Sequence, residues 1–213
     1  MDLDVAGLRD RLRRRTPPAP EVYGAGVVHG DDRIGGEPSG VTLASVLVPI
    51  VAHPDGLTVL FTQRTAHLKA HSGQVSFPGG RAEPGDATPE FTALRESQEE
   101  IGLKPERVEI LARLPDYITR TGYQVTPIVG LLTPPLELVP DPREVQEVFE
   151  VPLAFLLDPR NHRRQTRELN GRTVGFYEMP YMSNEGERYI WGATAGMLMN
   201  LYRQLACDAP PGA

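Results

Sequence analysis

Two apolar segments separated by three residues restrict the fold of this chain more than any other feature. Residues 44–53 read ASVLVPIVAH and residues 57–64 read LTVLFTQR, with the turn sequence PDG between them. Both segments are rich in β-branched and aromatic residues, which favour strands, and a short turn containing Asp-Gly favours a hairpin. The longest apolar run, VTLASVLVPIVA at 41–52, is interrupted by Thr, Ser and Pro and falls short of the roughly 20 apolar residues of a membrane span. We therefore predict a buried hairpin of two strands in a globular protein.

Strand patterns outnumber helix patterns in the rest of the chain. Because the strands come in runs between few helices, the order favours an α+β fold with a sandwich architecture over a doubly wound parallel sheet. We expect further strands at 74–78, 108–114 and 123–132, a strand from 145 that turns into a short helix after Pro152, a hairpin at 172–182 and 187–191, and helices at 2–15, 88–101 and 192–206.

The length and composition of the chain fit a single domain. With 213 residues, 40% of them hydrophobic, the chain can bury one core but is short for two domains. We expect an N-terminal helix and an extended arm at 1–40 that belong to the same domain as the core at 41–206, followed by a tail at 207–213. The formal net charge of −6 disfavours a nucleic-acid-binding surface, but a small anionic substrate beside a metal ion remains compatible with it.

The cysteine content and the N-terminal sequence bear on the cellular compartment. Cys207 is the only cysteine, which excludes an intrachain disulfide and a cysteine-based zinc site and fits a reducing compartment. The N-terminus, MDLDVAGLRDRLRRR, carries Asp and Arg where a secretory signal needs an apolar core. We expect a cytoplasmic protein without a membrane span.

The N-terminal helix ends in a cluster of arginines. Its leucines and valine recur at near-helical spacing among charges, which indicates a short amphipathic helix. The arginines could contact nucleic acid or a membrane, but a solvated helix end is favoured because cations are stabilised near a helix C-terminus. The residues concerned are Arg11, Arg13, Arg14 and Arg15.

A helix with clear boundaries is predicted in the middle of the chain. Thr88 is a good N-cap, Pro89 fits the first helical position, and Gly102 is a good stop. At about 100° per residue an apolar stripe and an acidic face lie roughly opposite each other. The stripe comprises Phe91, Leu94, Gln98 and Ile101, and the acidic face comprises Glu96, Glu99 and Glu100.

The acidic face is electrostatically unfavourable for an isolated helix. Like charges at these spacings cost a few tenths of a kcal/mol per pair, and the helix dipole disfavours anions near the C-terminus. Arg95 offsets part of this repulsion through an i,i+4 pair with Glu99. The face is either solvated or binds a hard cation such as Mg²⁺, with the glycine pair Gly79-Gly80 allowing close approach of the backbone to an ion or phosphate.

The stretch GGRAEPGDATPEFTALRESQEEIGL, residues 79–103, resembles the Nudix box, the loop–helix–loop motif of Mg²⁺-dependent hydrolases of nucleoside diphosphates linked to another group. Asp86 departs from the pattern because it stands where the motif has Glu, and eight residues rather than seven separate it from Arg95. Because Asp86 departs in both residue type and spacing, no metal role is assigned to it. Ser97 is a separate departure, at a position that is aliphatic in the motif. The matching residues are Gly80, Arg95, Glu96, Glu99, Glu100, Gly102 and Leu103.

A second resemblance concerns LFTQRTAHLKAHSGQVSFPGG at 60–80, which is similar to the segment that marks coenzyme A pyrophosphatases among Nudix enzymes. Phe61 replaces a Leu of that segment, Thr65 replaces a small residue, and Lys69 replaces an Arg. Lys keeps the charge but loses the bidentate fork, so phosphate recognition is altered rather than lost. The residues that fit are Leu60, Thr62, Gly73, Phe77, Pro78, Gly79 and Gly80.

The resemblance to the Nudix family implies an α/β/α sandwich with a mixed sheet and a set of metal ligands. It implies Mg²⁺, with Mn²⁺ as a substitute, bound by Glu99 and Glu100, while Glu96 is either a ligand or the base that activates water. The carbonyl of Gly79 is a further candidate ligand, and Arg95 is expected to orient the glutamates through a salt bridge.

Further site residues are expected outside the motif. Many family members use another Glu from a later loop, for which Glu144 is the candidate with Glu147 behind it, against a solvated strand edge. Arg64 and Lys69 are candidates for holding the pyrophosphate or the adenosine 3′-phosphate, against a role on the surface. For His67, His71 and Tyr123, phosphate contact or adenine stacking is weighed against loop stabilisation and core packing.

The resemblance implies a coenzyme A substrate that is cleaved to 3′,5′-ADP and 4′-phosphopantetheine. The alternatives are another pyrophosphate, such as NADH, ADP-ribose or a dinucleoside polyphosphate, and a catalytically silent module that binds a nucleotide. We expect a small-molecule nucleotide partner rather than nucleic acid or a membrane, and the sequence leaves a homodimer open.

Overall fold

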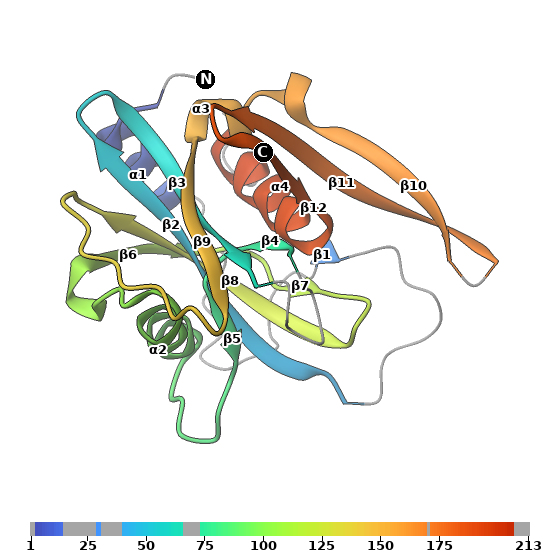
Figure 1. Cartoon of the computed structure of the whole chain (residues 1–213), viewed down its shortest axis with the longest axis horizontal. Coiled ribbons are helices and arrows are strands. Elements are labelled where there is room, and N and C mark those ends of the chain that lie inside the picture. Colours follow the sequence, from blue (N-terminus) through green and yellow to red (C-terminus); the bar gives the residue numbers. More distant parts are fainter. Residues whose placement is uncertain (1–2, 15–28, 31–39, 66–72, 170, 207–213) are drawn as a thin grey trace.

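The computed structural model describes residues 3–14, 29–30, 40–65, 73–169 and 171–206. These residues form two sheets and the helices that pack on them (Figure 1). The helices are α1 (Val5–Arg14), α2 (Pro89–Ile101), α3 (Leu153–Leu156) and α4 (Gly192–Ala206), with 3-10 turns at Pro105–Arg107 and Pro159–Asn161.

The larger sheet is mixed and is organised around a long central strand, β2 (Thr42–His53). It pairs in parallel with β8 (Tyr123–Leu132) and antiparallel with β3 (Gly56–Arg64). His53 pairs with Gly56, so the predicted hairpin is confirmed with Pro54 and Asp55 in its turn. The other strands of this sheet are β1 (His29–Gly30), β4 (Val75–Ser76), β5 (Gly79–Arg81), β6 (Val108–Arg113), β7 (Tyr117–Ile118) and β9 (Val145–Pro152).

A second, three-stranded antiparallel sheet lies beside α4 (Figure 1). It consists of β10 (Arg163–Leu169), β11 (Arg172–Ser183) and β12 (Gly186–Trp191). The hairpin of β11 and β12 follows the sequence prediction, whereas β10 was not expected. Its sequence, RRQTREL, lacks apolar alternation, and residues 163–168 are exposed, so its pairing with β11 is the feature that defines it as a strand.

Alternate side chains of β2 enter two separate apolar clusters, one on each face of the large sheet. Leu47 and Val51 pack with α2, while Val48 and Ile50 pack in the cluster that contains residues of α1 and α4. Because a strand sends successive side chains to opposite faces, a strand buried on both faces must be covered on both sides, here by α2 on one side and by α1 and α4 on the other. This is the α/β/α sandwich with a mixed sheet that the sequence predicted.

Helix α1 is an integral part of the second layer. Its Leu8 and Leu12 are fully buried in the same cluster as α4. The arginines on its other side have partners within the chain: Arg9 lies 2.5 Å from Glu109, and Arg14 lies 2.8 Å from Asp10. Among the described residues, no helix is long and apolar enough to cross a membrane.

Candidate active site

Helix α2 begins and ends where its sequence predicts. The hydroxyl of the N-cap Thr88 accepts a hydrogen bond from the Phe91 amide at 3.2 Å, and Pro89 occupies the first turn. At the other end Gly102 adopts a left-handed φ of 69° and donates to the Gln98 carbonyl at 3.0 Å. Glycine is favoured here because a Cβ is strained in this region of φ.

The predicted apolar stripe of α2 is wrong at Phe91, which is 51% exposed, and at Gln98, which is also exposed. Ile101 is buried as predicted, and it shares the buried side of the helix with Ala93 and Ser97. Small side chains let α2 approach β2 and β5 closely, and the Ser97 hydroxyl satisfies itself by donating to the Ala93 carbonyl at 2.6 Å. Ser97 thus fills the aliphatic position of the motif without leaving an unpaired polar group.

Glu100 lies on this buried side of the helix instead of on an exposed acidic face. One carboxylate oxygen accepts from the Gly79 amide at 3.1 Å, and the other lies 3.4 Å from the Arg64 guanidinium. Burial raises the pKa of Glu100 to about 7, although the Gly79 hydrogen bond and Arg64 oppose the rise. The site therefore contains a carboxylate that is costly to ionise in the absence of a stronger cation.

Gly79 and Gly80 are required by the close approach of β5 to its neighbours. A Cβ on Gly79, whose φ is 150°, would lie 2.5 Å from the Ser45 carbonyl oxygen and from the Val46 Cα. A Cβ on Gly80 would lie 2.5 Å from the Glu96 carboxyl. The glycine pair, expected as a loop, is a short strand that brings backbone against two of the predicted glutamates.

Glu96 is half-buried next to this strand. Its pKa is raised, mainly by burial, and the nearby Arg95 opposes the rise. Repulsion from Glu144 contributes to the raised pKa of both Glu96 and Glu100. The structure therefore places Glu144 within electrostatic reach of these two glutamates.

Backbone hydrogen bonds fix the turn that carries Glu144. The Asp141 amide donates to the Glu100 carbonyl at 2.8 Å, and the Thr65 amide donates to the Glu144 carbonyl at 2.9 Å. The turn is thereby attached to the end of α2 and to the end of β3. Glu147, predicted to stand behind Glu144, instead binds Arg188 at 2.6 Å.

Arg95 joins the loop before α2 to the acidic residues of the helix. Its guanidinium lies 2.9 Å from Glu96, 3.3 Å from Glu99 and 3.0 Å from Asp86. This geometry fits the orienting role that the resemblance implied. It also accounts for the exposed Glu99, whose carboxylate turns towards Arg95.

Asp86 has a clear structural place that the sequence did not reveal. Its side chain is 3% exposed and accepts from Arg95, from the Thr92 hydroxyl at 2.8 Å and from the Glu83 amide at 3.0 Å. Hydrogen bonding to Arg95 is the main reason that the pKa of Asp86 falls to about 2. Asp86 has a shorter side chain than the Glu of the motif and lies one residue further from Arg95 in sequence, but its carboxylate still pairs with the Arg95 guanidinium.

Some predicted residues fall outside the site or outside the described part of the chain. Lys69, His67 and His71 lie outside the described residues. Tyr123 is 38% exposed at the start of β8. Within the described ranges, no group of three or more His, Cys, Asp or Glu side chains is arranged to hold a metal ion.

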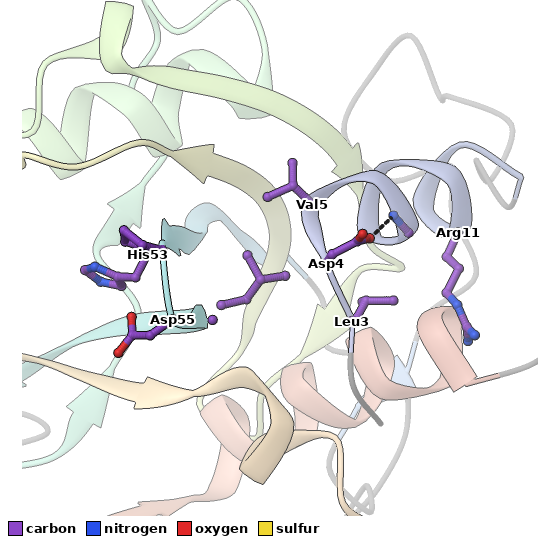
Figure 2. Close-up of a pocket in the computed structure, with 10 residues that line it drawn as sticks. Leu3, Asp4, Val5, Arg11, His53 and Asp55 are labelled. Carbon is purple, nitrogen blue, oxygen red and sulfur yellow. Dashed lines mark hydrogen bonds between the residues drawn. The ribbon is translucent and has the colours of Figure 1, made fainter.

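A cavity of about 670 Å³ lies at the opposite end of β3 from Arg64, between the start of α1 and the β2–β3 turn (Figure 2). The length of β3, 9 residues, separates the two ends by roughly 26 Å. Figure 2 shows Arg11 directed towards α4, where it donates to the Leu205 carbonyl. His53 is paired with Glu150 at 2.6 Å. Because it lies at the far end of β3, the cavity is distinct from the glutamate site.

Comparison with known proteins identifies the family. The model of the NUDIX domain matches residues 42–169, which is more than half of the chain. The chain belongs to the Nudix family. It is a Nudix hydrolase, and such enzymes act on phosphoric anhydrides, generally with a divalent metal ion.

Curated relatives agree with this assignment. The chain is 40% identical over 174 residues to "Uncharacterized Nudix hydrolase NudL" of Shigella flexneri serotype 5b, with 81% of this chain and 88% of the relative covered. It is 41% identical over 163 residues to the protein of the same name from Escherichia coli K12, with 76% and 82% covered. A crystal structure of a C. elegans Ap4A hydrolase binary complex is similar, with a TM-score of 0.44 and 22% identity over 52% of this chain and 80% of that chain.

Replacing Asp86 by Asn is expected to lower the free energy of unfolding by about 2 kcal/mol at neutral pH, because the amide loses charge-assisted hydrogen bonds to Arg95. The pKa of Asp86 is about 2 in the fold, against an ordinary value of 3.8. The stabilisation is therefore present above about pH 4 and is lost as the pH falls towards 2. Urea unfolding of both proteins across this range measures the difference.

Asp10→Asn is the matched control, because its pair with Arg14 is exposed and is expected to contribute no more than about 0.5 kcal/mol. Equal stability of wild type and Asp86→Asn at neutral pH contradicts the assigned role. The role is also contradicted if the difference in free energy of unfolding between wild type and Asp86→Asn stays the same as the pH falls towards 2.

Replacing Glu100 by Gln is expected to preserve or raise the thermal stability of the metal-free protein at about pH 8. Burial raises the pKa of Glu100 from 4.5 to about 7, so the wild type loses stability as the pH rises through this interval, whereas Gln does not titrate. Mg²⁺ is expected to raise the melting temperature of the wild type but not that of Glu100→Gln. Thermal unfolding with EDTA and with Mg²⁺ measures both effects.

The exposed Glu106 provides the control, since Glu106→Gln should keep the Mg²⁺-dependent rise in melting temperature. A metal-free Glu100→Gln protein that melts well below the wild type would mean that the Glu100 carboxylate stabilises the fold. The same Mg²⁺-dependent rise in Glu100→Gln and wild type would exclude Glu100 as a ligand.

Proposed function

We propose that this enzyme cleaves coenzyme A to 3′,5′-ADP and 4′-phosphopantetheine with Mg²⁺, and that Mn²⁺ can substitute. The observation that carries the proposal is the position of the segment at 60–80 relative to the glutamates. Arg64 and Gly79, both from this segment, contact Glu100 directly, and Gly80 lies against Glu96. Described residues at both ends of the segment that resembles coenzyme A pyrophosphatases thus lie against the glutamates, which supports the proposal.

The donor atoms of the site suit Mg²⁺. Carboxylate oxygens are the ligands that this cation prefers, and Glu96, Glu99 and Glu100 supply them from one helix. The pKa values of Glu96 and Glu100 are raised mainly by burial and further by repulsion from neighbouring carboxylates, and a divalent cation would stabilise the ionised form of both. When bound, Mg²⁺ would neutralise the charge of the pyrophosphate and acidify a bound water.

In the described arrangement these glutamates have cationic or amide partners within the chain. Glu99 is 61% exposed, so its side chain can leave Arg95 at little cost. We assign Glu99 and Glu100 as ligands. Glu96 is either the third ligand, in which case Glu144 accepts the proton of the attacking water, or is itself that base. The carbonyl of Gly79 remains a candidate for a further ligand.

The cations of the site divide into two roles. Arg95 is committed to Asp86, Glu96 and Glu99, so we assign it to orientation. Arg64 is 26% exposed and holds Glu100 only at 3.4 Å, which leaves its guanidinium able to bind a phosphate oxygen. Lys69 stays a proposal on the sequence resemblance alone.

Other pyrophosphate substrates, namely NADH, ADP-ribose and dinucleoside polyphosphates, are the nearest alternatives. They share the anhydride and the metal requirement, so the glutamate site serves all of them equally. A silent nucleotide-binding module is a different class of protein, which the intact glutamates Glu96, Glu99 and Glu100 disfavour. We also propose that the enzyme works in the cytoplasm, where coenzyme A and these nucleotides occur.

Incubation of the purified protein with Mg²⁺ and a panel of coenzyme A, NADH, ADP-ribose and a dinucleoside polyphosphate tests the proposal. Product masses should show 3′,5′-ADP and 4′-phosphopantetheine, with the highest kcat/KM for coenzyme A, and EDTA should abolish turnover. Coenzyme A left intact while NADH is cleaved would refute the choice of substrate.

Glu99→Gln and Glu100→Gln separate an enzyme from a silent binder. Both variants are expected to fold and to lose turnover by at least roughly 100-fold, because second-sphere changes alone typically cost 10–100-fold and these are proposed ligands. Normal nucleotide binding without turnover in the wild type would instead support the silent module.

A further inference from the structure

A row of stacked aromatic rings crosses the large sheet on the face opposite the glutamates. Phe61 of β3 stacks on Phe77 with ring centroids 5.1 Å apart and on Phe149 of β9 at 5.7 Å. Phe61 and Phe77 are almost completely buried in the cluster shared with α4. Close-packed interiors transmit small displacements, so these rings link β9 to the segment after β4.

One end of the row leads directly to the glutamate site. Phe77 is followed by Pro78, whose carbonyl accepts from the Leu47 amide at 2.9 Å, and then by Gly79, whose amide holds Glu100 at 3.1 Å. A single residue, Pro78, therefore separates a buried ring on one face of the sheet from a backbone donor on the other. The position of Phe77 restricts where the Gly79 amide can point.

Arg188 of β12 closes the other end of the row. Its guanidinium carbon lies 4.9 Å from the centre of the Phe149 ring, and its nitrogens bind both carboxylate oxygens of Glu147 at 2.6 and 2.8 Å. The Arg188 side chain is 11% exposed, and its Nε has no hydrogen-bond partner. A desolvated cation over a ring, held by a bidentate carboxylate, is one of the stronger polar contacts available to a protein.

Glu147 makes this contact relevant to a second part of the site. It belongs to β9, three residues after Glu144, and pairs with Gln63 of β3. Arg188 thus holds the strand that follows the Glu144 turn and, through Phe149, the ring row that reaches Gly79. Both contacts of Arg188, with Glu147 and with Phe149, start from β12, and β12 contributes none of the glutamates Glu96, Glu99, Glu100 and Glu144.

We propose that Arg188 is a positioning residue for the hydrolase site, acting through Glu147 on the Glu144 turn and through Phe149, Phe61 and Phe77 on the Gly79 amide. The inference rests on the proposed metal-dependent hydrolysis and adds the three-stranded sheet to the parts that set its geometry. A residue that merely braces β12 would contribute to stability but would leave metal affinity and turnover of the folded protein unchanged.

Arg188→Met is the variant that tests the inference, because it keeps much of the apolar stem and removes the guanidinium. We expect a loss of about 10-fold in kcat with little change in KM, and a weaker affinity for Mn²⁺ measured by EPR on protein without substrate. Arg188→Lys keeps the cation but loses the bidentate fork, so it should recover part of the loss.

The matched control is Glu185→Gln. Glu185 is the second partner of Arg188, at 2.9 Å, but is 74% exposed, so its removal should leave kcat and Mn²⁺ affinity within about twofold of wild type. If Arg188→Met does not fold, Glu147→Gln takes its place and should lower kcat and Mn²⁺ affinity in the same direction.

The two readouts separate failure of this inference from failure of the proposed function. Folded Arg188→Met, or folded Glu147→Gln in its place, with the kcat and Mn²⁺ affinity of the wild type overturns the positioning role alone. A wild type that binds no Mn²⁺ and hydrolyses none of the pyrophosphates overturns the proposed function and this inference with it. The role of Arg188 is supported if Arg188→Met lowers both kcat and Mn²⁺ affinity while Glu185→Gln keeps the values of the wild type.

Discussion

The burial of like-charged carboxylates beneath one helix is the constraint on which the site depends. Glu100 is buried, Glu96 is half-buried, and Glu144 repels both, so the fold must hold negative charge where water cannot screen it. The protein offsets this cost with an amide donor from Gly79 and with the guanidinium of Arg64. The remaining excess of negative charge is what makes the site suited to a divalent cation.

Small residues make this arrangement possible. Gly80 leaves room for the Glu96 carboxyl, and Ala93 and Ser97 let α2 lie close to the sheet. Larger side chains at these places would push the helix away and would separate the glutamates from the strand that carries their amide donor. Arg95 then holds Glu96 in place on the helix, and Asp86 in the preceding loop holds Arg95.

Local patterns predicted the elements of the fold, and long-range contacts explain what the patterns missed. The hairpin at its Pro54-Asp55 turn and the caps of α2 follow from residues close in sequence. The orientation of α2 does not, because Phe91 is apolar but exposed, while Glu100 is charged but buried. Helical periodicity depends only on the positions of apolar residues, so it does not reveal that the Glu100 carboxylate points inward to accept a hydrogen bond from the Gly79 amide.

The same limit applies to the site. The Nudix-box residues could be located from the sequence because their spacing is local. Asp86 could not be assigned, because its shorter side chain and shifted position take on meaning only when Arg95 and Thr92 are seen around it. The partner of Glu147 could not be predicted either, because Arg188 lies in another sheet, 41 positions along the chain.

A crystal structure with Mn²⁺ and an uncleavable coenzyme A analogue tests the central claim most directly. We expect anomalous density for Mn²⁺ bound by carboxylate oxygens of Glu96, Glu99 and Glu100, with the pyrophosphate of the analogue in contact with the metal. Metal density at another place, or an analogue bound away from these glutamates, would contradict it.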